Sequence, residues 1–77
     1  ENALRWHFGN VAMSSEGERN DRLYRAACRL AGEAVVGNLD WQYAQRQLAK
    51  AAQVAGLTWG ETYQTLENGM EYAGRGT

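Results

Sequence analysis

Apolar residues recur every three or four positions along most of the chain, a spacing typical of amphipathic α-helices. The sequence contains no proline, and glycines divide it into blocks of helical length. The pattern predicts four helices, over residues of about 2–13, 16–36, 41–55 and 59–73. Because the connections are short, successive helices should be antiparallel neighbours. We therefore expect an all-α fold, a small four-helix bundle that occupies residues 1–77 as one domain.

The first predicted helix has one alternative. Leu4, Phe8 and Val11 are spaced as on one helix face, although Gly9 weakens the helix. Residues 4–8 alternate as a strand would, but this run is too short to carry a prediction.

Capping residues mark where the other helices begin. Ser15 and Glu18 have the spacing of a capping box, which predicts a helix start near residue 16. Asp40 is a good N-cap for the third helix. Thr58 and Glu61 form a second capping-box pair at the fourth.

Glycines mark where helices end. Gly37, or Asn38 after it, can supply the left-handed residue that closes the second helix. Gly56 closes the third, with Leu57 placed for the hydrophobic contact that accompanies such an end. Gly69 lies inside the fourth helix, where we expect it to allow close approach of a neighbouring helix or of a ligand.

Each predicted helix has an apolar stripe for the core, and the alanines in these stripes allow the helix axes to approach closely. The stripes are Leu23, Ala27, Leu30, Ala31 and Ala34 in the second helix, Trp41, Ala44, Leu48, Ala51, Ala52 and Ala55 in the third, and Tyr63, Leu66 and Met70, extended by Trp59 and Ala73, in the fourth.

Basic residues gather on the second helix, although the formal net charge of the chain is only -1. Arg19, Arg22, Arg25 and Arg29 fall within an arc of roughly 120° at the helical repeat. Such a row of guanidinium groups suits phosphate oxygens. The alternative is a solvated helix face, partly neutralised by an ion pair of Glu18 with the arginine one turn later.

Aromatic residues offer stacking surfaces for bases, although at helical spacing they are more often part of a core. Tyr24 and Tyr43 lie toward the edges of their apolar stripes and are expected to be exposed.

Catalytic chemistry is difficult to build from this sequence. His7 has no obvious partner, and Asp21 and Asp40, the only aspartates, lie near predicted helix starts. The sequence has no paired-carboxylate motif, no zinc-ligand spacing and no phosphate-binding glycine loop. Cys28 reads as a partly buried free thiol in a reducing compartment, and no apolar run is long enough to span a bilayer. We expect a non-catalytic domain without a cofactor of its own and without a membrane partner.

The order of several short motifs resembles the helical bundle domain of phage- and plasmid-encoded primase–polymerases. The matching stretches, between Ala3 and Gly74, are Gly17-Glu18-Arg19-Asn20, Leu23, Ala26-Ala27, Gly37-Asn38-Leu39, Leu48-Ala49-Lys50-Ala51-Ala52, Gly56-Leu57, Glu61 and Thr65-Leu66-Glu67-Asn68-Gly69. Family members show Gly-x-Arg-Asn at the start of one helix, then Gly-Leu, a Glu and a Thr-Ile-x-Ser-Gly run. Here Leu66 replaces the isoleucine and Asn68 the serine.

The resemblance implies that this chain is a piece of a larger primase–polymerase or primase–helicase that acts in the cytoplasm of a bacterial host. An upstream catalytic domain of the archaeo-eukaryotic primase type would carry the metal-binding carboxylates and use ATP and dNTPs with Mg²⁺ or Mn²⁺, and a helicase domain often follows. The bundle would bind the single-stranded DNA template and the initiating nucleotide triphosphate, so that primer synthesis can start.

The resemblance also implies site residues. Arg19 would contact a phosphate and Asn20 a base edge or a sugar, although Asn20 has the alternative of bonding local backbone at a helix start. The expected nucleic-acid or nucleotide-binding set is Arg19, Asn20, Arg22, Arg25, Arg29, Tyr24, Thr65 and Asn68.

One other function remains open, and a second is disfavoured. An adaptor between catalytic and helicase domains would expose an apolar patch that includes Trp6, Phe8 or Trp59. A helix-turn-helix that reads duplex DNA is disfavoured, because the helix after Gly56-Leu57-Thr58 carries Glu61, Glu67 and Glu71.

Overall fold

The computed structural model describes residues 2–75, with side chains from Arg5 onward. Within them it contains four helices and no strand: α1 (Asn2–Ala12), α2 (Arg19–Val35), α3 (Trp41–Ala55) and α4 (Trp59–Arg75). The predicted all-α four-helix bundle is confirmed, and the strand alternative near the start is wrong. The side chain of Leu4, one of the predicted core residues, lies outside the described residues.

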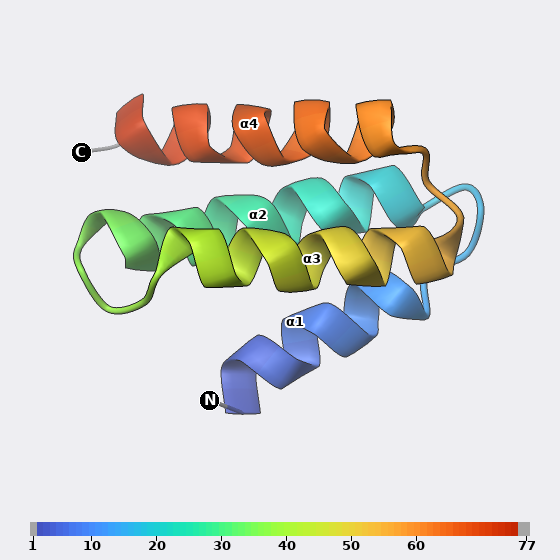
Figure 1. Ribbon diagram of the computed structural model, residues 1–77, viewed down its shortest axis with the longest axis horizontal. Coiled ribbons are helices and arrows are strands. Elements are labelled where there is room, and N and C mark those ends of the chain that lie inside the picture. The colour runs from blue at the N-terminus through green and yellow to red at the C-terminus, as the bar shows by residue number, and fades with distance from the viewer. Residues whose placement is uncertain (1, 76–77) are drawn as a thin grey trace.

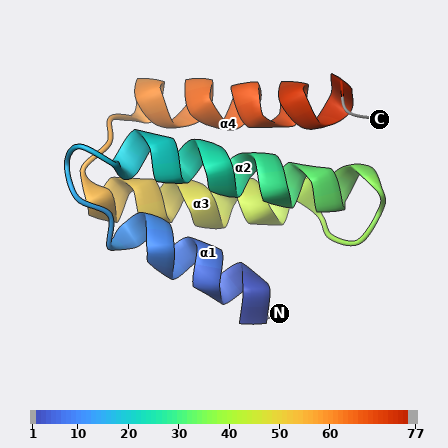
Figure 2. The ribbon, with the colours of Figure 1, turned by 180° about the vertical axis from the view of Figure 1, so that it is seen from behind.

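The helices are arranged around an antiparallel α2–α3 pair (Figure 1). α4 lies on one side of this pair and α1 on the other, and no contact joins α1 to α4 within residues 2–75. Successive helices run antiparallel, as predicted, and the view from behind agrees (Figure 2). The most extensive contact, however, is between α2 and α4, which run in the same direction, whereas α3 and α4 touch least.

Local capping signals fix most of the helix ends. The Asp40 side chain accepts a hydrogen bond from the Gln42 amide at 3.1 Å, so the predicted N-cap of α3 is confirmed. Gly56 closes α3 in the left-handed conformation with φ of 97°. The second capping box is also confirmed, because the Glu61 amide donates to Thr58 Oγ1 and the Thr58 amide to Glu61 Oε1, each at 3.1 Å.

The first capping box is wrong, and α2 begins at Arg19 instead of near residue 16. The Glu18 carboxylate is engaged one turn ahead by Arg22, whose Nη2 lies 2.8 Å from Glu18 Oε1. Ser15 contributes only its backbone carbonyl, which accepts from the amides of Glu18 and Arg19 at 3.0 and 2.9 Å. The side-chain pair that would have formed the box therefore has a competing partner on the next turn of the helix.

The core is confirmed in α2 and α3 with small shifts. The buried residues are Leu23, Ala26, Ala27, Leu30 and Ala31 in α2 and Ala44, Leu48, Ala49, Ala51 and Ala52 in α3, joined by Val11 of α1, Leu57 and Leu66.

The predicted stripe of α4 is rotated. Tyr63, expected in the core, is 45% exposed, while Thr62, Thr65 and Gly69 are buried beside Leu66. The buried face of α4 therefore contains several small residues, which brings its backbone close to α2 at Gly69 and leaves the larger Tyr63 ring outside.

Gly69 marks the closest approach of the two helices. A Cβ built on it would lie 2.6 Å from Ala27 Cβ and 3.1 Å from both the Ala27 carbonyl carbon and the Cys28 amide nitrogen. The space that a side chain would need is already filled by α2, so the glycine serves helix packing.

Candidate nucleic-acid interface

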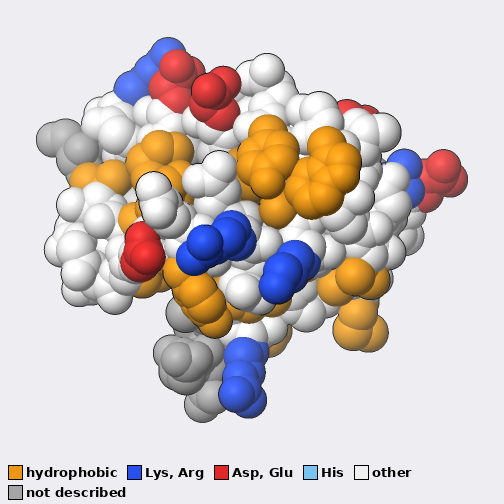
Figure 3. All heavy atoms as spheres, in the orientation of Figure 1, with side chains coloured by type: hydrophobic (Ala, Val, Ile, Leu, Met, Phe, Trp, Pro, Cys, Tyr) orange, Lys and Arg blue, Asp and Glu red, His pale blue; other side chains and the backbone are white. Residues whose placement is uncertain are grey.

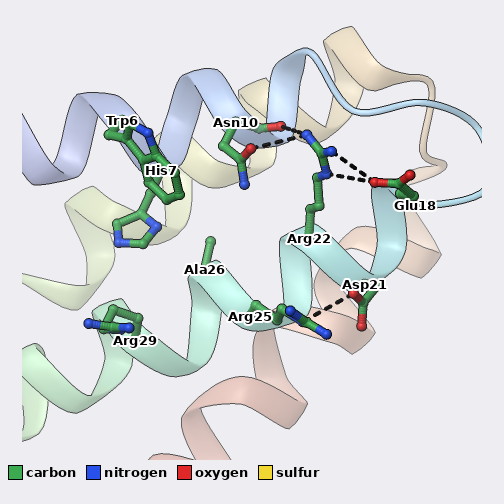
Figure 4. Close-up of a pocket in the computed structure, with 9 residues that line it drawn as sticks. All are labelled: Trp6, His7, Asn10, Glu18, Asp21, Arg22, Arg25, Ala26 and Arg29. Atoms are coloured by element: carbon green, nitrogen blue, oxygen red, sulfur yellow. Dashed lines mark hydrogen bonds and ion pairs between the residues drawn. The ribbon is translucent and has the colours of Figure 1, made fainter.

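A groove of about 410 Å³ runs between α1 and α2 (Figure 4). One wall consists of aromatic and polar side chains of α1, and the other carries three arginines of α2. Its lining consists of Trp6, His7, Asn10, Glu18, Asp21, Arg22, Arg25, Ala26 and Arg29.

The α1 wall presents a stacking surface. Trp6 and Asn10 are one helical turn apart and so share a face of α1. The Trp6 side chain is 64% exposed, and its ring meets that of His7 edge-on with centroids 5.0 Å apart. Partial burial, and to a lesser degree the charge of Arg29, lowers the pKa of His7 below 6.5, so the imidazole is neutral at pH 7. A neutral ring beside an exposed indole is compatible with a base lying against either.

The α2 wall carries three guanidinium groups, one on each of three successive helical turns. Arg22 Nη1 donates to Asn10 Oδ1 at 3.0 Å and to the Asn10 carbonyl at 3.4 Å, which ties the last turn of α1 to α2. Arg25 Nε lies 3.1 Å from Asp21 Oδ2, and both side chains are more than half exposed. Such exposed pairs one turn apart contribute only about 0.3–0.5 kcal/mol, so a phosphate can compete for the guanidinium.

Arg29 has neither an ion pair nor a hydrogen bond within the described part of the chain. It lies at the end of the groove nearest His7 (Figure 4). Of the three arginines in the groove it is the one without an ionic partner, so it is the one most ready to accept an anion.

Three of the predicted site residues lie elsewhere and have structural partners. Arg19 Nη1 donates to the Ala55 carbonyl at 3.2 Å, where the guanidinium meets the negative end of α3. The Thr65 hydroxyl donates to Asn20 Oδ1 at 2.7 Å and joins α4 to the first turn of α2. Asn20 and Thr65, which belong to the two motifs quoted for the resemblance, thus contact each other, but at a helix–helix contact outside the groove.

The last two predicted site residues are also outside the groove. Asn68 is exposed on α4 and accepts from Gln64 Nε2 at 3.1 Å. Tyr24 is exposed, as expected, and lines a shallow hollow with Cys28, Tyr72 and the same two arginines, Arg25 and Arg29, that border the groove. Hydrogen bonding to the Cys28 side chain raises the pKa of Tyr24, which keeps its hydroxyl protonated. Arg25 and Arg29 therefore form a ridge with aromatic rings on both sides.

Trp6, His7 and Asn10 were missed as site residues by sequence reasoning. The available signal was the spacing of Trp6 and Asn10, one turn apart on a helix whose apolar residues lie on another face. That spacing does not say which neighbour the polar face will meet, so only the packing of α1 against α2 shows that they belong to one groove.

Residues 2–75 hold no cluster of His, Cys, Asp or Glu suited to a metal ion. Nor is any helix among them long and apolar enough to cross a bilayer.

Comparison with known proteins adds no further assignment. No family model, curated protein or solved structure matches the chain.

Proposed function

We propose that this domain binds single-stranded nucleic acid, with one strand lying in the α1–α2 groove. In the setting suggested by the sequence motifs, the strand is the DNA template of a primase–polymerase in a bacterial cytoplasm. The domain then helps an upstream catalytic domain to assemble template and initiating nucleotide triphosphate.

The observation that carries the proposal is the unpaired guanidinium of Arg29 in the same groove as the exposed Trp6 ring and the half-buried His7 ring. Proteins that bind single strands combine cations that follow the phosphates with aromatic rings on which bases stack. Here Arg25 extends the cationic row, and Tyr24 provides a second ring beyond it. A strand that crosses α2 at this ridge would find a ring on each side of its phosphates.

Binding should be modest and dependent on salt. The groove lining carries three arginines against Glu18 and Asp21, so its charge is only weakly positive. If each arginine neutralises one phosphate, affinity for a single strand should fall by about 20-fold between 50 and 200 mM salt.

The test is a fluorescence-anisotropy titration of the 77-residue chain with a labelled oligothymidylate at several salt concentrations, with and without ATP and Mg²⁺. Arg29→Gln should weaken binding and reduce the slope of log affinity against log salt by about 0.7, the contribution of one phosphate contact. Arg46→Gln is the matched control, because Arg46 is exposed on α3 and lines none of the described hollows.

An NMR titration places the strand. Shifts of the Trp6 indole and of the α2 amides from 22 to 29 are expected. Equal effects of the two substitutions, or no binding at 50 mM salt, would overturn the proposal and favour the adaptor function.

A further inference from the structure

A second groove, of about 420 Å³, lies between α3 and α4, on the side of α3 that faces away from α1 (Figure 1). It exists because α4 packs mainly on α2 and touches α3 only slightly. Its lining consists of Trp41, Gln45, Tyr63, Leu66, Glu67, Met70 and Glu71.

The floor and one edge of this groove are apolar. Leu66 is buried at its base, and Trp41 and Met70 are half-buried along its length. Tyr63 at its edge stacks on Trp59 with ring centroids 5.6 Å apart and planes within 15°. Tyr63 is 45% exposed and Trp59 is 55% exposed, so the stacked pair forms an apolar surface that a partner can reach. Hydrophobic side chains gather on this face of the molecule (Figure 3).

The charge of the groove has one sign. Glu67 and Glu71, one turn apart on α4, are the charged residues in its lining, and no lysine or arginine belongs to it. Glu71 is paired with Arg75 at 3.2 Å in an exposed contact, while Glu67 has no partner within residues 5–75. Arg46 and Lys50, on the outer face of α3, are exposed and lie outside the lining.

We propose that the α3–α4 groove is a docking site for an amphipathic helix of a partner protein, with lysine or arginine bordering its apolar stripe. The apolar stripe packs against Tyr63 and Met70, and the basic border meets Glu67 and Glu71. A groove between two helices accepts a third helix through interdigitating side chains. The stretch of α4 from residue 59 to 71 corresponds to roughly 18 Å, which a partner helix of about three turns covers.

The test uses two labelled 16-residue peptides with leucines at the same helical positions, one with lysine and one with glutamate at the remaining positions. Anisotropy with the 77-residue chain should show the lysine peptide binding at least tenfold more tightly. Glu67→Lys should weaken that binding severalfold, since a rim charge is reversed. Tyr63→Ala should weaken it severalfold, since it removes an aromatic ring that the partner's apolar stripe would contact.

Glu33→Lys is the matched control for charge, because Glu33 is exposed on α2 and outside the groove. It should leave peptide binding unchanged. Circular dichroism verifies that each variant remains helical, and both Glu67 and Tyr63 are exposed, so their substitution leaves the core intact.

Equal affinity for the two peptides, or equal effects of Glu67→Lys and Glu33→Lys, would overturn the proposal. So would sedimentation equilibrium that shows self-association which Tyr63→Ala abolishes, because the occupant would then be a second copy. The oligothymidylate titration reads a different groove, so the two proposals succeed or fail separately.

Discussion

Replacing Gly69 by alanine should destabilise the protein, even though alanine is the better helix former by about 1 kcal/mol. The added Cβ would lie 2.6 Å from Ala27 Cβ and 3.1 Å from the Ala27 carbonyl carbon and the Cys28 amide nitrogen. Because the last two atoms belong to the backbone of α2, no side-chain rotation relieves the contact. The helices would have to separate by roughly 1 Å to restore ordinary carbon–carbon contact.

The magnitude follows from two opposing effects. Overpacking costs about 1–3 kcal/mol, and contact with backbone places Gly69→Ala in the upper part of that range. After the gain of about 1 kcal/mol in helix propensity, a net loss of about 1–2 kcal/mol is expected. With a urea dependence of about 1 kcal/mol per molar for a chain of this size, the unfolding midpoint should fall by about 1–2 M.

Gly32→Ala is the control for this reasoning. Gly32 lies inside α2, and apart from its chain neighbours and the adjacent helix backbone no atom lies within 4 Å of its added Cβ. Its substitution should raise the free energy of unfolding by about 1 kcal/mol through propensity alone. Urea unfolding followed by circular dichroism measures both variants. A midpoint for Gly69→Ala at or above that of the wild type would refute the close-packing argument.

Three further predictions concern single side chains. Thr65→Val removes the nearly buried hydroxyl that donates to Asn20 and should cost about 1 kcal/mol in urea unfolding; no measurable loss would show that the bond does not stabilise the fold. Thr58→Ala should lower the free energy of unfolding by about 1 kcal/mol, because it removes the helix cap. Hydrogen bonds from the Thr58 amide and hydroxyl hold the pKa of Glu61 low, so an NMR titration of that carboxyl should show a higher pKa in the variant. Burial lowers the pKa of His7, so the free energy of unfolding should fall as the pH drops below 6.5. A bound phosphate would raise the pKa of His7, so affinity for single strands should increase toward lower pH. His7→Gln should remove both of these pH dependences.

The fold was predictable where the signal is local. Asp40, Gly56 and the Thr58–Glu61 pair each act within one turn of the chain, and the structure uses all of them. The capping box predicted for Ser15 did not form, because the carboxylate of Glu18 pairs instead with Arg22 one turn further along the helix.

Signals that depend on a distant partner were not readable from the sequence. Periodicity alone favoured the large Tyr63 for the core, whereas the contact with α2 selects small residues such as Gly69 and Thr65. Likewise, the repeat of the arginines shows which face of α2 they share. It does not show that Arg19 reaches the end of α3 while Arg29 remains unpaired.

The position of α1 links ligand binding to helix docking. α1 contacts α2 and α3 but not α4, and it supplies one whole wall of the candidate groove. A strand that touches both walls therefore also holds α1 in place. At a ligand concentration of 100 times Kd, this linkage contributes about 2.7 kcal/mol, and amide hydrogen exchange in α1 should slow by up to about 100-fold. Because the coupling is reciprocal, anything that immobilises Asn2–Ala12 would raise the affinity for the proposed strand, so the proposed binding could be tuned from outside the groove.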